Sequence, residues 1–166
     1  MDNYICKIAN IDEMNTKWDY EIANANEDKN NYIIWKKDHI NRVKKGYTIP
    51  YYGILNDKII CECTAAINKT VIQNSDKLID NKTAYLMAFR TITEYQGKGY
   101  FSKLYHFMIE DLKKRGYKYA TLGVEPVEEK NKEIYFKYGF TEHIKDDFEK
   151  YPDGTVVTVE YYRKKL

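Results

Sequence analysis

The chain has 166 residues, of which 43% are hydrophobic and 31% charged, and its formal net charge is +2. This composition excludes a disordered chain, and the length predicts one folded domain over residues 1–166 with its own hydrophobic core. The 27 basic and 25 acidic residues nearly balance, which argues against nucleic acid as the main partner.

The first elements predicted are a short strand and a helix. The strand covers Ile5–Ala9. Asp12 stands where an N-cap is expected, and a helical stretch follows it to about Ala25. The polar segment Asn26–Asn31 then predicts a break in the chain.

A second helix and a β-hairpin come next. Apolar positions over Tyr32–Lys45 indicate the helix, which Gly46 ends. The hairpin consists of strands at Thr48–Leu55 and Lys58–Ile67, with a turn at Asn56-Asp57 between them.

The middle of the chain contains a loop, a buried strand and an amphipathic helix. Residues 68–83 are polar and poorly patterned, so little regular structure is predicted there. The largely apolar run Tyr85–Thr91 predicts a buried strand. The helix covers Tyr100–Lys114, and Gly116 caps it.

The last part of the chain alternates strands and one helix. Strands are predicted at Tyr117–Val124, Phe140–Ile144 and Thr155–Tyr162, and a helix at Glu128–Lys137. The complete order is strand, two helices, a strand meander, then strand, helix, strand, helix and two strands. This order predicts an α/β domain with a mixed sheet.

Two glycines, Gly97 and Gly99, stand between the buried strand and the amphipathic helix. A dinucleotide-binding fingerprint would need a third glycine where Ser102 stands, and a nucleotide triphosphate loop would need Ser or Thr after Lys98. Two glycines at a helix N-terminus can instead point N–H groups at a pyrophosphate. A tight turn that binds nothing is the alternative.

The residues around these glycines resemble the acetyl-coenzyme A loop of the GNAT superfamily of N-acetyltransferases. That loop has the pattern Gln/Arg-x-x-Gly-x-Gly/Ala, whose fixed places fall on Gln96, Gly99 and Phe101. Residues 124–140 resemble the family's later strand and helix, which end in a Tyr-x-x-x-Gly-Phe signature. The resemblance covers residues 85–142, and two motifs in the right order are more specific than either one alone.

The resemblance implies the fold, the cosubstrate and the reaction. The fold would be a mixed, mostly antiparallel central sheet flanked by helices. The cosubstrate would be acetyl-coenzyme A (acetyl-CoA), with no metal. A primary amine would attack the thioester directly and form a tetrahedral intermediate. A longer acyl donor is the alternative within this activity. A non-catalytic module that keeps the fold, and that binds acyl-CoA or has a regulatory role, is the alternative from another functional class.

The resemblance also assigns cofactor-binding residues. The strand end would pair with the pantetheine arm, the loop and helix start would hold the pyrophosphate, and two positions near the next helix would contribute further contacts. These residues are Phe89, Arg90, Thr91, Gln96, Gly97, Lys98, Gly99, Tyr100, Phe101, Ser102, Lys103, Glu128 and Asn131. Three of them depart from the family pattern: Phe101 and Asn131 stand at usually small positions, and Glu128 stands where asparagine is common.

Tyr135 occupies the place of the family's general acid, which would protonate the leaving thiolate. Packing on a helix face is the alternative for a chain with 17 tyrosines. The base that takes the amine proton is less defined. Glu62 and Glu125 are the predicted candidates and Glu94 is a third, while a solvated surface carboxylate is the ordinary state of a glutamate.

The acceptor is predicted only as a small-molecule or peptide amine. In the family its site is shaped by the first two helices and the strand hairpin, here near residues 18–35. Aromatic side chains there could line the pocket or belong to the core: Trp18, Tyr20, Tyr32 and Trp35. A homodimer is a further expectation, because the alternating Val157, Val159 and Tyr161 could pair across chains.

The cysteines and the absence of long apolar segments predict a cytoplasmic protein. Three cysteines cannot all pair within one chain, and Cys61 and Cys63 lie two residues apart in one strand. With no second pair of ligands, a zinc site is not expected. No segment approaches the ~18 apolar residues of a membrane span, and residues 1–11 have no signal-peptide core, so no membrane partner is expected.

Overall fold

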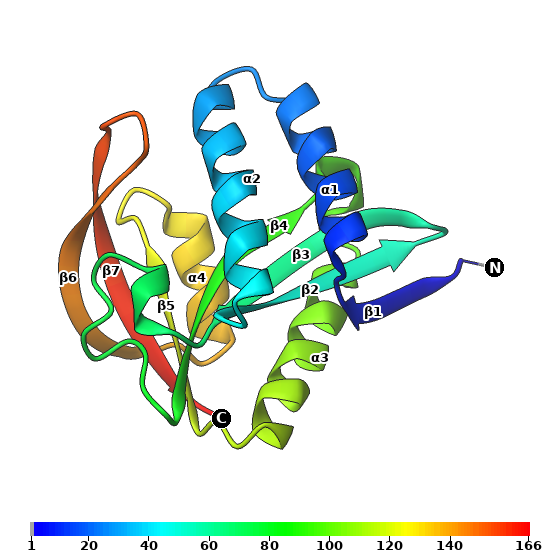
Figure 1. The fold of residues 1–166 in the computed structure, drawn as a ribbon. Helices are drawn as coiled ribbons and strands as arrows, with labels where there is room; N and C mark the ends of the chain where they lie inside the picture. Colours follow the sequence, from blue (N-terminus) through cyan, green and yellow to red (C-terminus); the bar gives the residue numbers. More distant parts are fainter. Residues whose placement is uncertain (1) are drawn as a thin grey trace. The chain divides into compact units, whose positions relative to one another are not determined.

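The computed structural model describes residues 2–166 (Figure 1). Its helices and strands follow one another in the predicted order. They are β1 (Tyr4–Ile8), α1 (Ile11–Ala23), α2 (Lys29–Lys44), β2 (Thr48–Leu55), β3 (Lys58–Ala66), β4 (Thr83–Thr91), α3 (Tyr100–Lys114), β5 (Tyr119–Val124), α4 (Glu129–Lys137), β6 (Glu142–Lys150) and β7 (Val156–Lys165). Two short 3₁₀ helices, Lys69–Val71 and Thr93–Tyr95, lie between them.

The strands form a mixed sheet in which antiparallel pairs predominate. The hydrogen-bonded order is β1-β2-β3-β4-β5-β7-β6. β4 and β5 run parallel, whereas β1 with β2, β5 with β7 and β6 with β7 are antiparallel. This confirms the predicted fold class.

The chain divides into two compact units, each with its own contacts. Unit 1 contains the chain up to Thr64 together with Ala88–Met108, and unit 2 contains Ala65–Met87 and Ile109–Leu166. The boundary falls inside β4, next to Ala88, whose φ of 58° is unusual for a residue with a side chain in a strand.

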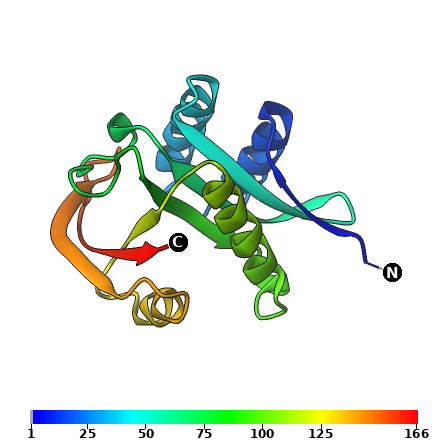
Figure 2. The same ribbon diagram turned by 90° about the horizontal axis from the view of Figure 1, so that it is seen from below.

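In unit 1, helices α1 and α2 lie on one face of strands β1–β3 and the first half of α3 lies on the other (Figure 2). Successive side chains of a strand point to opposite faces of the sheet, and β2 has buried side chains on both faces. Tyr52 and Ile54 pack with Met14 of α1, while the Tyr51 ring meets Phe107 of α3 at 6.1 Å between centroids. The unit therefore has an apolar layer on each side of its strands.

Helix α1 begins two residues earlier than predicted. Its N-cap is Asn10, not Asp12: the Asn10 side chain accepts from the Glu13 N–H at 2.8 Å, and Glu13 Oε1 accepts from the Asn10 N–H at 2.9 Å. This reciprocal pair is a capping box and satisfies two amides that the helix leaves free. The predicted break of residues 26–31 is also too long, because α2 begins at Lys29.

The β2–β3 hairpin confirms the predicted turn. Asn56 and Asp57 have φ angles of 48° and 67°. Two residues with positive φ form the type I′ turn, whose twist matches that of paired strands.

In unit 2, residues 68–83 contain little regular structure, as predicted: a 3₁₀ turn at Lys69–Val71 is followed by loop up to Thr83, where β4 begins. Val71, Leu78 and Ile79 are buried, and the Thr121 hydroxyl donates to the Leu78 carbonyl at 2.7 Å. The apolar residues of this segment have no helical or strand period, so the pattern did not reveal their burial.

The C-terminal strands differ from the prediction in length and in pairing. The strand predicted at Phe140–Ile144 is instead β6, Glu142–Lys150, whose mixed charges hide its strand character. β7 lies between β5 and β6 and pairs with both. The predicted pairing of this strand across a dimer is therefore wrong, since neither of its edges is open.

Within residues 2–166, no helix is both long and apolar enough to cross a membrane. The same part of the chain contains no group of three or more His, Cys, Asp or Glu side chains that could hold a metal ion. Cys6, Cys61 and Cys63 are free thiols.

Candidate functional site

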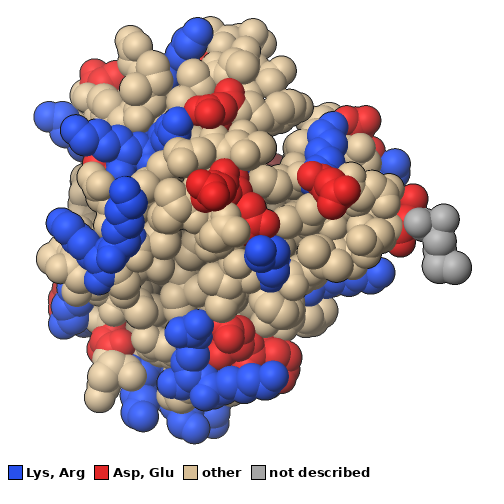
Figure 3. Space-filling view, turned by 45° about the vertical axis from the view of Figure 1, so that its right-hand side comes forward, with Lys and Arg blue, Asp and Glu red and all other residues tan. Residues whose placement is uncertain are grey.

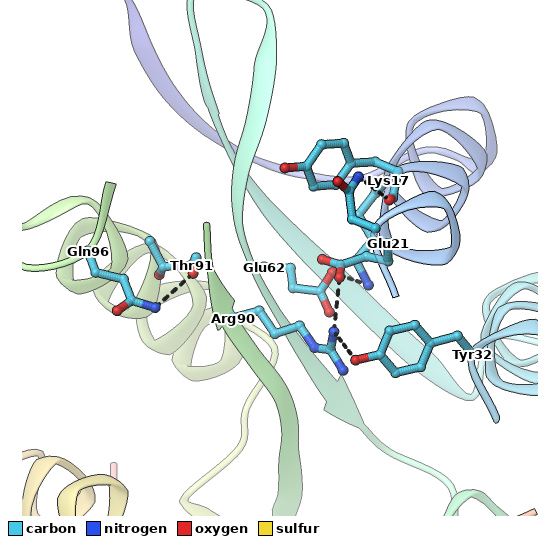
Figure 4. Close-up of polar contacts among 9 residues, drawn as sticks. Lys17, Glu21, Tyr32, Glu62, Arg90, Thr91 and Gln96 are labelled. Carbon is cyan, nitrogen blue, oxygen red and sulfur yellow. Dashed lines mark hydrogen bonds and ion pairs between the residues drawn. The ribbon is translucent and has the colours of Figure 1, made fainter. Parts of the chain in front are cut away.

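The end of β4 and the start of α3 are joined by a short, ordered loop in unit 1. Thr93–Tyr95 forms a single 3₁₀ turn. The Gln96 side chain then reaches back and donates to the Thr91 carbonyl at 3.1 Å (Figure 4). This bond closes the loop onto the strand end, so that Phe89–Thr91 and the glycines belong to one local structure.

The loop presents a row of unpaired backbone amides. Gly97 and Gly99 have φ angles of 73° and 85°, which residues other than glycine rarely adopt. The N–H groups of residues 97–102 donate to no other atom of the described chain, and the first bond of α3 is that from Lys103 to the Gly99 carbonyl at 3.3 Å. Unpaired amides at a helix N-terminus favour an anion. The arrangement fits a pyrophosphate.

Phe101, the bulky residue at a usually small position, turns its ring toward the strand. The rings of Phe101 and Phe89 lie 5.2 Å apart between centroids. Next to it, the Tyr100 carbonyl accepts from the Tyr4 hydroxyl at 2.7 Å. These contacts hold the side chain against β4 and leave the Phe101 N–H in the row of free amides.

A pocket of about 240 Å³ lies beside this strand end, between α1, the β2–β3 turn and the last residues of β4. Its wall combines aliphatic side chains with three acidic and three basic ones. The lining residues are Thr16, Lys17, Tyr20, Glu21, Asp57, Lys58, Ile59, Ile60, Cys61, Glu62, Arg90 and Ile92.

The deepest charges of the pocket are an ion pair between α1 and β3. Lys17 Nζ lies 2.5 Å from Glu62 Oε2, and both side chains are only 6% exposed. Glu62 is therefore not the solvated surface carboxylate that a glutamate usually is. Burial lowers the pKa of Lys17 and the Glu62 carboxylate opposes that shift. The ammonium also lies 3.6 Å from the centre of the Trp18 ring.

Arg90 directs its side chain into the same pocket. Its Nη1 donates to Glu21 Oε2 at 3.1 Å and to the Tyr32 hydroxyl at 3.5 Å (Figure 4). Arg90 was predicted as part of the strand end that pairs with pantetheine. The structure adds that its guanidinium lies among the side chains of α1 and α2.

The four aromatic residues proposed for an acceptor pocket have different environments. Trp18 is a core residue, 3% exposed, that packs edge-on against His39 and Tyr32. Tyr32 also stacks near Trp35, with ring centroids 5.6 Å apart. Only Tyr20 lines the pocket.

The predicted general acid belongs to unit 2, on helix α4. Tyr135 is partly buried, and burial together with the nearby Glu128 carboxylate raises its pKa to about 12. Because both influences disfavour the phenolate, the hydroxyl keeps its proton throughout the neutral range. This is the protonation state that a general acid needs.

The other predicted carboxylates differ in their surroundings. Glu125 follows β5, and burial and Glu128 raise its pKa. The Tyr151 hydroxyl donates to Glu125 at 3.5 Å. Glu128 precedes α4 and is exposed, as is Asn131. Glu94 is a surface residue whose side chain is 63% exposed and pairs with Lys58 at 3.3 Å.

Sequence reasoning missed Lys17 and Glu21, the α1 partners of Glu62 and Arg90. A signal was available for Lys17, which stands three residues after the buried Met14 and next to the buried Trp18. A lysine on the apolar stripe of a helix needs an internal partner, and Glu62 is the carboxylate that faces it. Nothing in the sequence pairs Glu21 with Arg90, which lie 69 residues apart.

The surface shown in Figure 3 carries both signs of charge, with acidic groups among the basic ones. Along α3, Asp111 pairs with Arg115 and Glu110 with Lys113. Such pairing leaves no one-sided basic face on this helix.

Comparison with known protein families gives one match that covers most of the chain. The model of the acetyltransferase (GNAT) family matches residues 12–140. No curated protein is significantly similar in sequence.

Solved structures with the same fold extend the comparison to nearly the whole chain. The ribosomal-protein-S18-alanine N-acetyltransferase from Escherichia coli has a TM-score of 0.72 at 13% identity, over 99% of this chain and 94% of that one. An N-acetyltransferase from Staphylococcus aureus has a TM-score of 0.67 at 14% identity, over 98% of both chains. The yncA protein from Salmonella typhimurium, whose structure contains its cofactor acetyl-CoA, has a TM-score of 0.65 at 13% identity. The match covers 99% of this chain and 94% of that one. Identities this low show a shared fold.

Proposed function

The chain belongs to the acetyltransferase (GNAT) family, whose members use acetyl-CoA, and from this premise we propose that it transfers the acetyl group to a primary amine. The amine attacks the thioester carbonyl directly, and a tetrahedral intermediate collapses to the amide and the thiolate. The observation that carries the proposal is the row of free N–H groups at residues 97–102, which Gly97 and Gly99 direct from the start of α3.

Each part of the loop has a proposed task. The amides of residues 97–102 bind the pyrophosphate, with the helix N-terminus and the Lys98 and Lys103 side chains adding positive charge. Gln96 fixes the loop to the strand end through the Thr91 carbonyl. The backbone of Phe89, Arg90 and Thr91 pairs with the pantetheine arm and polarises the thioester carbonyl. Glu128 and Asn131 are proposed as further contacts.

Tyr135 is proposed as the acid that protonates the leaving thiolate. Its support is its place in the Tyr-x-x-x-Gly-Phe signature and a phenol whose raised pKa, about 12, keeps it protonated. Of the two proposed bases, Glu125 is the better supported, because burial raises its pKa toward neutral pH. Glu62 is already engaged in an ion pair with Lys17.

We also propose that residues 1–166 form one acetyltransferase domain, active in the cytoplasm. The three free thiols suit a reducing compartment. The acceptor is a small-molecule or peptide amine, with no role for nucleic acid. A homodimer, if one forms, uses a surface other than the edges of β7, which are both paired.

The test is acetyl-CoA binding by calorimetry combined with a thiol-release assay over a panel of primary amines. We expect saturable binding and thiol release that depends on the amine. Binding without release on any amine would contradict the proposed transfer and favour the non-catalytic acyl-CoA-binding module.

A further inference from the structure

The pocket beside the β4 end contains a guanidinium that is only partly paired. Arg90 makes both of its hydrogen bonds through Nη1, to Glu21 and Tyr32. Its Nε and Nη2 groups donate to no atom of residues 2–166. The side chain lines the pocket and is 35% exposed. A guanidinium offers five N–H donors in a planar fork. One edge of that fork is therefore available to a ligand.

The available edge favours a carboxylate. Arginine binds planar carboxylates through two parallel N–H···O bonds, which are stronger than bonds between neutral groups. The other basic side chains of the pocket are already engaged, since Lys17 pairs with Glu62 and Lys58 pairs with Glu94. Arg90 is thus the cation best able to take a new anionic partner.

The charge balance of the pocket limits the ligand further. Its wall carries three acidic side chains, Glu21, Asp57 and Glu62, and three basic ones, Lys17, Lys58 and Arg90. A ligand of net charge zero keeps this balance, whereas a polyamine or a phosphate ester would leave uncompensated charge in a partly buried site. A volume of about 240 Å³ is below the usual range for drug-sized ligands.

We propose that this pocket binds an acceptor with a carboxylate beside its amine, a free amino acid, through the open edge of the Arg90 guanidinium. The proposal rests on the proposed acetyl transfer. The Arg90 backbone belongs to the strand end assigned to the thioester, and its side chain lines the pocket. A carboxylate anchored on Arg90 therefore keeps the neighbouring amine near that strand end. Arg90 is a specificity-determining residue in this account.

The test compares amino acids with their α-amides as acceptors in the thiol-release assay. L-Alanine, L-methionine, L-phenylalanine and L-glutamine, which are zwitterions of net charge zero, are each paired with the α-amide, which keeps the shape and removes the negative charge. The amine of an amide is less basic, so intrinsic reactivity at neutral pH favours the amide. We expect kcat/KM to favour the acid by about tenfold or more, which then reports recognition of the carboxylate.

Variants of Arg90 assign the preference to the guanidinium. In Arg90→Gln, KM for the acids rises about 10- to 100-fold, kcat changes little, and the preference over amides disappears. Arg90→Lys keeps the charge without the fork and retains part of the preference. Lys36→Gln is the matched control. It breaks the ion pair between Lys36 of α2 and Asp19 of α1, 2.7 Å long, and neither residue lines the pocket. We expect this variant to keep the preference for acids. An unchanged acetyl-CoA Kd shows that each variant is folded, and if Arg90→Gln does not fold, Arg90→Lys decides.

Two results would overturn the proposal while the acetyl transfer stands. One is a wild-type protein that uses amides as well as acids, and the other is an Arg90→Gln variant that keeps the acid preference. If no amine supports thiol release, the transfer itself fails. Calorimetric titration with the four amino acids then decides: binding that Arg90→Gln abolishes supports the site, and no binding overturns it.

Discussion

At the scale of single residues, the sequence reveals only half of the Lys17–Glu62 pair. Glu62 was predicted as a candidate base, yet its burial depends on a lysine 45 positions earlier in the chain. Sequence alone marks Lys17 as out of place on an apolar stripe but cannot name its partner. Long-range pairing of charges is set by packing, which a pattern read along the chain does not contain.

Removing one member of this pair should be costly. Lys17→Met leaves the Glu62 carboxylate buried without its cation, and we expect the free energy of unfolding to fall by about 3–5 kcal/mol. The double variant Lys17→Met/Glu62→Leu removes both charges and should regain most of that loss. Urea denaturation of the three proteins measures the effect. Equal destabilisation by the single and the double variant would show that packing, not charge, holds this site.

Tyr135 is the proposed general acid, and burial raises the pKa of its hydroxyl to about 12. Tyr135→Phe keeps the ring and removes the proton. We expect kcat to fall by ~10²–10⁴-fold with the acetyl-CoA Kd unchanged. Steady-state kinetics and calorimetry separate the two quantities. A kcat within a factor of about two of wild type would remove Tyr135 from the proton transfer.

At the scale of elements, the sequence predicted helix bounds and turns correctly where the apolar periodicity was strong or the turn residues were characteristic. The bounds of α3 and the Asn56-Asp57 turn agree with the prediction, because the apolar stripe and the positive-φ residues are local signals. β6 was predicted too short because most of its residues are charged and its sequence does not alternate apolar with polar residues. The buried residues Val71, Leu78 and Ile79 of segment 68–83 follow no helical or strand period.

The glycine loop yields a prediction with an internal control. A Cβ at Gly97 or Gly99 would meet no atom within 4 Å, so alanine there costs only the strain of a positive φ, about 1–2 kcal/mol. In the proposed binding mode, the added methyl group would compete with the pyrophosphate for the space beside the amides of residues 97–102. We therefore expect Gly97→Ala and Gly99→Ala to weaken acetyl-CoA binding about tenfold or more.

Gly46 provides the control, since it has a φ of 75°, equally open space and a place at the end of α2. Gly46→Ala should lower stability by a similar amount and leave the acetyl-CoA Kd unchanged, as measured by calorimetry. If all three variants bind acetyl-CoA like wild type, the loop is a turn and not a phosphate site.

At the scale of the whole molecule, the 17 tyrosines give the chain a sensitivity to alkali. Burial raises the pKa of Tyr135 and of Tyr151 to about 12, and it raises the pKa of Tyr4, Tyr52, Tyr85, Tyr161 and Tyr162 as well. In the unfolded chain these groups ionise near pH 10. Between the unfolded and folded pKa values the unfolded state releases protons that the folded state keeps, so stability falls as pH rises above about 10.

Urea denaturation between about pH 8 and pH 11 measures this loss, with tyrosinate absorbance recording ionisation of the folded protein. We expect the free energy of unfolding to decline steeply above about pH 10. A smaller loss begins above about pH 8, because burial also raises the pKa of the Cys6, Cys61 and Cys63 thiols. A constant value up to pH 11 would mean that the buried tyrosines ionise as easily as exposed ones.

The family could be identified from the sequence, because two motifs in the right order are more specific for a family than either motif alone. The acceptor could not be identified, since the pocket proposed for it is lined by side chains of α1, the hairpin turn, β3 and β4 that only the fold brings together.

The most direct test of the proposed acetyl transfer measures thiol release and acetylated amine in the same reaction, by absorbance and mass spectrometry. Acetyl transfer predicts one acetylated amine for each thiol released, and no release when the amine is omitted. Thiol release that is independent of the amine, or that yields no acetylated product, would contradict it.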